Sequence, residues 1–390
     1  MLLSVCSDMT LVVKKRAVWP RATEGNEMSN PSILILQGGG ALGAYECGVY
    51  QALSDRLENL AVVAGTSIGA VNASIIANPS FPFFFPVPGA LPRWNAILTS
   101  TMLGNPHMFV PQLGKWEPFF PLFPTSFSSS HPLEQTMTRH FGEYGPGKAE
   151  PRLILTAVDI ETGASKAFDS WNECLTAKQV VASGSLPPGY PAKEVDGQFY
   201  WDGGLWSNTP LPEVLNALQE SPDHAWSAEC EYDVYIVDVF PSQSQVPQNG
   251  LQVSRRFFEL IFADKTVFDK KSAEWVNQYI KLVRTLELHQ DALPPDVVRE
   301  LIEDHLPRIE NRAILTITQI KRTALPYEEI SSGADFSPER ITALIAQGYR
   351  DAKHQLPPEQ QAKKPLVKEP AVEQLDGTAS SSIESGPYRG

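Results

Sequence analysis

The sequence contains, twice in succession, a short aliphatic run that is followed by a glycine-rich turn and then by a helical apolar pattern. The first run, Ile33–Leu36, precedes Gly38-Gly39-Gly40, and the second, Leu60–Ala64, precedes Gly65-Thr66-Ser67-Ile68-Gly69. Short apolar runs that end at glycine are typical of buried strands, and apolar residues three and four apart are typical of helices. Strands that alternate with helices predict an α/β fold with a mainly parallel central sheet flanked by helices.

Later segments extend this pattern. The aliphatic runs at Leu153–Val158 and Val234–Val239 predict further strands, and the run Ala313–Ile320 predicts another near the C-terminal end. Beyond about residue 250 the apolar spacing is helical. Ser337 followed by Pro338 predicts the start of a helix, because serine is a favoured N-cap and proline suits the first helical turn.

These patterns divide the chain into expected parts. Residues 1–31 are expected to form an N-terminal extension, 32–245 a catalytic domain, 246–356 a C-terminal accessory helical region, and 357–390 a disordered tail. Residues 79–132 interrupt the catalytic domain with an insertion rich in proline and phenylalanine. This insertion is interpreted first as an irregular segment that folds over the core, and alternatively as a lid or a lipid-facing surface.

Charge and composition exclude several classes of protein. The net charge of −13 argues against general affinity for nucleic acid, which depends on Lys and Arg at the phosphates. No apolar run is long enough to span a membrane, and the basic residues that follow Leu11-Val12-Val13 stand in the wrong order for a signal peptide. The expected location is therefore cytoplasmic, with peripheral membrane contact through the insertion.

The four cysteines lack paired spacing and are interpreted as free thiols: Cys6, Cys47, Cys174 and Cys230.

The second glycine turn carries a candidate nucleophile. Gly65-Thr66-Ser67-Ile68-Gly69 has the form Gly-x-Ser-x-Gly, in which a strained turn between strand and helix exposes the serine hydroxyl. The pattern alone is weak, and its position between a predicted strand and a predicted helix gives it weight. A serine nucleophile needs a base, and Asp202 stands in the turn Trp201-Asp202-Gly203-Gly204.

The first glycine turn permits two functions. Backbone amides at the start of a helix bind anions, so the loop could hold the oxyanion of an acyl-transfer intermediate. Gly38, Gly40 and Gly43 also satisfy the spacing of a dinucleotide-binding loop. A dinucleotide fold expects an acidic residue after the second strand, whereas Gly65-Thr66-Ser67 stands there, which disfavours an oxidoreductase.

A Ser-His-Asp esterase of the α/β-hydrolase type is the other alternative. Its histidine would follow the aspartate along the chain, which makes His224, His289 and His305 the competitors of a mechanism without histidine.

The three motifs, in this order, resemble the patatin-like phospholipase family, of the bacterial type with a C-terminal accessory domain. The resemblance covers about residues 32–215. It extends to segments between and after the motifs, which are Thr156–Gly163, Ala182-Ser183, Pro187-Pro188 and Asn208-Thr209-Pro210. Leu42 departs from the pattern, since many relatives have a basic residue in the glycine loop.

The resemblance implies a lipid acyl hydrolase that uses a Ser67–Asp202 catalytic dyad, a covalent acyl-serine intermediate, and no metal or organic cofactor. It assigns the oxyanion hole to the first glycine loop, whose candidate residues are Gly38, Gly39, Gly40 and Gly43. The flanking glycines of the other two motifs are Gly65, Gly69, Gly203 and Gly204. The implied partner is a phospholipid or another acyl ester, and the sequence predicts no oligomeric state.

Overall fold

The computed structural model describes residues 30–78, 126, 129–146, 151–219, 231–241, 246–263, 267–299, 305, 313–323, 333 and 335–357. Nearly all of the expected N-terminal extension, most of the phenylalanine-rich insertion and the expected C-terminal tail lie outside the described residues.

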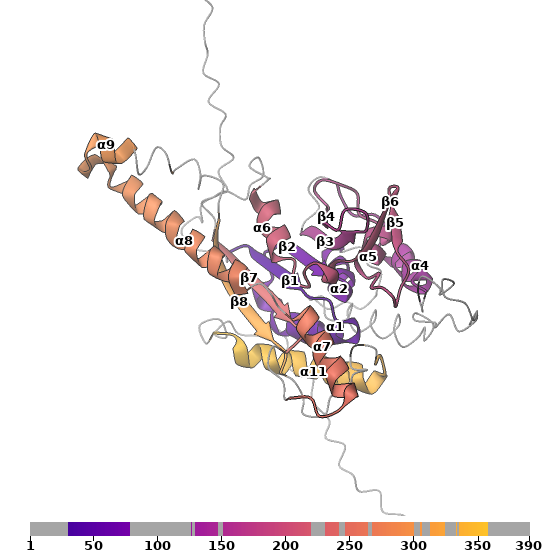
Figure 1. The fold of residues 1–390 in the computed structure, drawn as a ribbon. Helices are drawn as coiled ribbons and strands as arrows, with labels where there is room; N and C mark the ends of the chain where they lie inside the picture. The colour runs from indigo at the N-terminus through magenta and orange to yellow at the C-terminus, as the bar shows by residue number, and fades with distance from the viewer. Residues whose placement is uncertain are drawn as a thin grey trace, which may run out of the picture. The chain divides into compact units, whose positions relative to one another are not determined.

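The core is an eight-stranded sheet with the strand order β5-β6-β3-β2-β1-β7-β8, in which β4 pairs with β3 (Figure 1). The strands are β1 (Ser32–Leu36), β2 (Leu60–Thr66), β3 (Arg152–Asp159), β4 (Ser165–Asp169), β5 (Lys193–Val195), β6 (Gln198–Asp202), β7 (Glu231–Asp238) and β8 (Ile314–Lys321). The five strands β3, β2, β1, β7 and β8 run parallel, and β4, β5 and β6 form an antiparallel edge. The predicted α/β fold with a mainly parallel sheet is confirmed.

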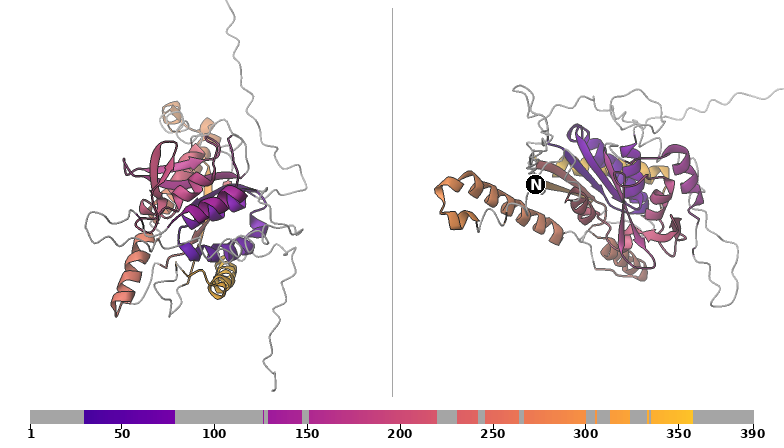
Figure 2. Two further views of the ribbon diagram at one scale, coloured as in Figure 1. Left: turned by 90° about the vertical axis from the view of Figure 1, so that its right-hand side faces the viewer. Right: turned by 90° about the horizontal axis from the view of Figure 1, so that it is seen from above.

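Helices cover both faces of the sheet (Figure 2). The α-helices are α1 (Gly43–Ala52), α2 (Ile68–Ala77), α4 (His131–His140), α5 (Ala177–Ser183), α6 (Leu211–Gln219), α7 (Gly250–Phe262), α8 (Val267–Leu288), α9 (Pro295–Val298) and α11 (Pro338–Gln355). Short 3-10 turns are η1 (Gly40–Leu42), η2 (Ser54–Arg56), η5 (Gly203–Leu205) and η6 (Gln290–Ala292). Leu34 and Leu36 of β1 pack with α1, α2 and α11, whereas Ile33 and Ile35 pack on the opposite face with α6 and α8. This alternation follows from the two-residue period of a strand.

The C-terminal part of the described chain completes the sheet. β8 pairs with β7 over its whole length, and Ser337 caps α11 by accepting a hydrogen bond from the amide of Arg340. α11 packs on α1, where a methyl group added to Gly348 would lie 2.0 Å from the carbonyl oxygen of Tyr45. The sequence analysis expected an accessory helical region over residues 246–356; within that range β8 joins the central sheet and α11 packs on α1. Helical periodicity cannot reveal which sheet or helix a distant segment will contact.

Replacing Gly348 by Val should destabilise the fold by about 3 kcal/mol, because the added side chain would strike backbone atoms of α1. Urea unfolding followed by circular dichroism measures this loss. Gly250→Val is the matched control, since a methyl group there meets no atom within 4 Å. Equal stability of the two variants would contradict the tight packing of α1 against α11.

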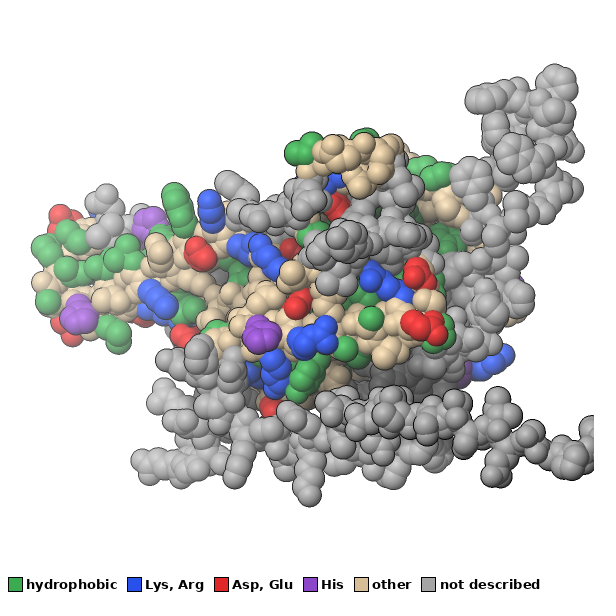
Figure 3. All heavy atoms as spheres, turned by 90° about the horizontal axis from the view of Figure 1, so that it is seen from below, with side chains coloured by type: hydrophobic (Ala, Val, Ile, Leu, Met, Phe, Trp, Pro, Cys, Tyr) green, Lys and Arg blue, Asp and Glu red, His purple; other side chains and the backbone are tan. Residues whose placement is uncertain are grey.

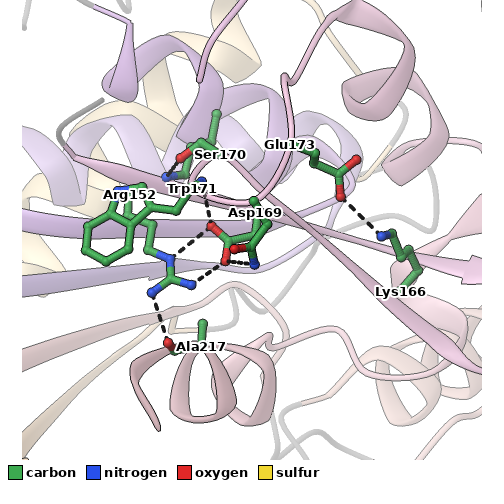
Figure 4. Close-up of polar contacts among 9 residues, drawn as sticks. Arg152, Lys166, Asp169, Ser170, Trp171, Glu173 and Ala217 are labelled. Atoms are coloured by element: carbon green, nitrogen blue, oxygen red, sulfur yellow. Dashed lines mark hydrogen bonds and ion pairs between the residues drawn. The ribbon is translucent and has the colours of Figure 1, made fainter. Parts of the chain in front are cut away.

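A buried ion pair fixes the antiparallel edge of the sheet (Figure 4). Arg152 of β3 donates from Nε to Oδ1 of Asp169 at 2.9 Å, and a second contact joins its Nη2 to the other carboxylate oxygen. Nη1 of Arg152 donates to the carbonyl of Ala217 in α6 at 2.9 Å, and the guanidinium lies 4.4 Å from the centre of the Trp171 ring. A buried pair with these additional bonds is costly to break, because either charge left alone would be unsolvated.

Candidate active site

One strand sets the distance between the two candidate catalytic residues. β3 lies between β2 and β6, with Thr156 opposite Thr66 and the next residue, Ala157, opposite Asp202. Ser67 follows Thr66 directly, and Asp202 is the last residue of β6. The register of β3 therefore brings together residues that are 135 positions apart in the chain. No local sequence pattern specifies this register.

Ser67 occupies a strained turn between β2 and α2. Its φ is 58° and its ψ is −122°, which places a residue other than glycine in the left-handed half of conformational space. Such strain concentrates at functional sites, where the surrounding structure holds it in place. The amide of Ser67 donates to Oγ of Ser183 at 2.9 Å, and the residue is partly exposed. The turn thus presents the hydroxyl outside the buried backbone.

The flanking glycines allow this turn to close. A methyl group on Gly65 would lie 2.1 Å from the carbonyl oxygen of Gly69, and one on Gly69 would lie 2.5 Å from that of Leu36. A side chain at Gly65 would force the end of β2 from the start of α2, and one at Gly69 would force α2 from the end of β1. The Gly-x-Ser-x-Gly spacing therefore reflects backbone packing around the serine.

Asp202 is buried, with 2% of its surface exposed. Its carboxylate accepts a hydrogen bond from the amide of Gly204, at 2.7 Å between Oδ1 and N, and the Ser67 side chain lies close enough to lower its pKa. Gly203 begins η5, and a methyl group there would lie 2.6 Å from the carbonyl oxygen of Thr156. The structure thus places the candidate nucleophile and the candidate base side by side.

Burial raises the pKa of Asp202 to about 6, and the Ser67 side chain and the Gly204 amide offset part of that rise. Burial acts in this direction because an ionised carboxylate loses its hydration inside the protein. A carboxylate with a pKa near neutrality is still ionised at neutral pH, and it takes up a proton more readily than an exposed aspartate. This property suits a general base.

The first glycine loop lies against the nucleophile. A methyl group on Gly38 would lie 2.7 Å from Cβ of Ser67, so only glycine permits this approach. The amide of Gly38 donates to Oδ1 of Asn208 at 3.1 Å, and the amide of Gly43 donates to the carbonyl of Gly40. Within the described part of the chain, the amides of Gly39 and Gly40 make no hydrogen bond to a backbone or side-chain acceptor.

Residues 34–215 match the family model described as patatin-like phospholipase. The chain contains a patatin-like phospholipase domain. No curated protein sequence matches it. Among solved structures, the crystal structure of VipD from Legionella pneumophila is similar at 13% identity and a TM-score of 0.34, covering 84% of this chain and 67% of that chain.

Asn208 is a residue of the patatin-like domain that the sequence analysis did not place in the site. Besides accepting from the Gly38 amide, it donates from Nδ2 to the carbonyl of Gly38 at 3.0 Å and to the carbonyl of Phe262 at 3.0 Å. It therefore fixes the peptide units on both sides of the glycine that touches Ser67. The sequence resemblance could have indicated Asn208, because Asn208-Thr209-Pro210 is one of the segments that resemble the family. Ala182-Ser183 is another such segment.

Within the described residues, neither His289 nor His305 forms a hydrogen bond with Ser67 or Asp202. His289 follows α8 and bonds the carbonyl of Thr285 there, while His305 bonds the hydroxyl of Tyr279. His224 lies outside the described residues.

Over the same described ranges, no cluster of side chains could hold a metal ion, and no helix is both long and apolar enough to cross a bilayer.

Proposed function

We propose that this chain hydrolyses acyl esters of lipids, with Ser67 as nucleophile and Asp202 as general base. The observation that carries the proposal is the proximity of the strained Ser67 turn to the buried Asp202 carboxylate, which the register of β3 sets and through which Ser67 lowers the pKa of Asp202. The family supports lipid acyl hydrolysis in general. The proximity of Ser67 and Asp202 supports the finer mechanism.

The proposed reaction has two halves. Asp202 takes the hydroxyl proton as Oγ of Ser67 attacks the ester carbonyl, and the amides of Gly39 and Gly40 donate to the negative oxygen. Collapse breaks the bond to the leaving alcohol, which receives the proton from Asp202, and an acyl-serine remains. Water then attacks the acyl carbon with Asp202 again as base, which releases the fatty acid and restores the hydroxyl of Ser67.

A fluorophosphonate probe tests the nucleophile directly, because it forms a stable bond only with an activated serine. We expect the wild-type protein to be labelled once, on the peptide that contains Ser67, with release of fluoride. Mass spectrometry of the digested protein locates the label, and the Ser67→Ala variant is the control. Folded wild-type protein that resists labelling would contradict the proposal.

The same probe separates the dyad from a Ser-His-Asp triad. His224→Ala, His289→Ala and His305→Ala should each be labelled at close to the wild-type rate, since the pKa of Asp202 is set by burial, Ser67 and Gly204 and by no histidine. A loss of about a hundredfold or more in one folded histidine variant would favour the triad, because a catalytic base contributes effects of that size.

The raised pKa of Asp202 predicts the pH dependence of catalysis. A general base must be ionised, so kcat/KM for a soluble ester should fall about tenfold per pH unit below pH 6 and level off above it. Stopped assays with a short-chain ester from pH 4.5 to 8 measure this profile. A profile without an inflection between pH 5 and 7 would argue that another group limits the reaction.

A further inference from the structure

α7 has a polarity opposite to that of an ordinary surface helix. Its solvent-facing side carries apolar side chains, among them Phe257 and Leu260, which are 60% and 55% exposed. Its charged Glu259 is only 5% exposed and pairs at 3.1 Å with Arg256, which also donates to the carbonyl of Pro241. A helix exposed to water normally turns its charges outward and its apolar stripe inward. The outer side of α7 therefore suits an apolar environment.

α8, another surface helix, exposes charged side chains. On the face seen from below, acidic, basic and histidine side chains are interspersed among hydrophobic ones (Figure 3). α8 exposes Trp275 and Leu282, but the charged Glu274 and Lys281 beside them are exposed as well. The reversed polarity of α7 is consequently not a general property of this surface.

α7 ends at the candidate active site. The carbonyl of its last residue, Phe262, accepts the hydrogen bond from Asn208, and a methyl group on Gly204 would lie 3.4 Å from the Phe262 ring. The ring centres of Phe262 and Phe240 are 5.8 Å apart. Leu205 and Trp206, which follow Gly204 directly, are also exposed. Apolar surface thus continues from α7 to the turn that holds Asp202.

We propose that this surface docks the protein on a lipid bilayer, with α7 lying in the plane of the membrane interface. The α7 patch comprises Val253, Phe257, Phe258 and Leu260 of α7 together with Leu205 and Trp206. The inference rests on the proposed function, because a lipid ester reaches Ser67 most directly if the site opens onto the membrane that holds it.

Chemistry favours a bilayer over a protein partner. Exposed phenylalanine and leucine insert into the boundary between head groups and acyl chains, and tryptophan prefers this same boundary. The net charge of −13 disfavours electrostatic attraction to anionic lipid. Docking through the α7 patch should therefore occur on zwitterionic phosphatidylcholine and depend little on salt.

Flotation of the full-length protein with phosphatidylcholine vesicles tests this proposal. Phe257→Ser combined with Leu260→Ser should lower the partition onto vesicles at least about tenfold, since two exposed apolar side chains are lost from the interface. The matched control is Trp275→Ser combined with Leu282→Ser on α8, which should float like the wild type. Thermal melting verifies that both double variants are folded.

The outcomes separate this proposal from the proposed function. Ser67→Ala should float like the wild type, because docking needs no hydroxyl. If the wild-type protein floats with vesicles but hydrolyses no ester, only the catalytic proposal is overturned. If the wild-type protein hydrolyses a soluble ester but remains in the dense fraction without vesicles, only the docking proposal is overturned. Docking is also overturned if the α7 and α8 double variants lose flotation equally. Light scattering that shows a dimer dissociated by the α7 substitutions would assign the patch to a second copy.

Discussion

Replacing Ser67 by Ala should reduce ester hydrolysis by about 10⁴-fold or more, because the substitution removes the only atom that the proposed mechanism uses to form the acyl intermediate. The fold should survive, since alanine retains the Cβ that lies beside Gly38. Turnover of a short-chain ester at pH 8 measures the loss. Activity that stays within tenfold of wild type would refute the assignment of Ser67.

A second substitution at this position separates catalysis from strain. Ser67→Gly should be equally inactive but more stable than Ser67→Ala by about 1 kcal/mol, because glycine adopts a φ of 58° without steric cost. Urea unfolding of the two variants under identical conditions compares them. Equal unfolding free energies would show that the turn at Ser67 stores no strain.

Replacing Asp202 by Asn should abolish turnover and yet stabilise the protein above pH 6. The folded-state pKa of about 6 exceeds that of an exposed aspartate, so the folded protein binds this proton more tightly than the unfolded chain. Ionisation of Asp202 therefore lowers the unfolding free energy of the wild type as the pH rises from about 4 to 6. Asparagine never ionises, so the variant should be more stable at pH 8 by about 3 kcal/mol, with the difference largely gone near pH 4.

Asp169→Asn is the matched control for this prediction, since it places the same substitution at another buried aspartate. Because Asp169 pairs with Arg152, the control should lose about 3 kcal/mol of unfolding free energy at pH 8. Chemical denaturation at pH 4.5 and pH 8 measures both variants. If Asp202→Asn were destabilised as strongly as the control, the ionised carboxylate of Asp202 would stabilise the fold, contrary to its raised pKa.

Local sequence patterns predicted most of the structural elements. The aliphatic runs gave strands β1, β2, β3, β7 and β8 to within a few residues, since buried strands need apolar side chains on both faces. The N-cap at Ser337 was predicted because a cap depends only on its own first turn. The pairing of β8 with β7 and the packing of α11 on α1 were not predicted, because they are non-local contacts.

The sequence by itself determined the chemical groups of the candidate site, since the serine turn, the acidic turn and the glycine loop each have a short signature that reflects local backbone geometry. Only the tertiary structure decided how these groups meet. The register of β3 places Ser67 beside Asp202, Asn208 orients the peptide units of Gly38, and burial raises the pKa of the base. The reversed polarity of α7 also depends on the tertiary structure, because a helical pattern shows which residues share a face but not which face meets the protein.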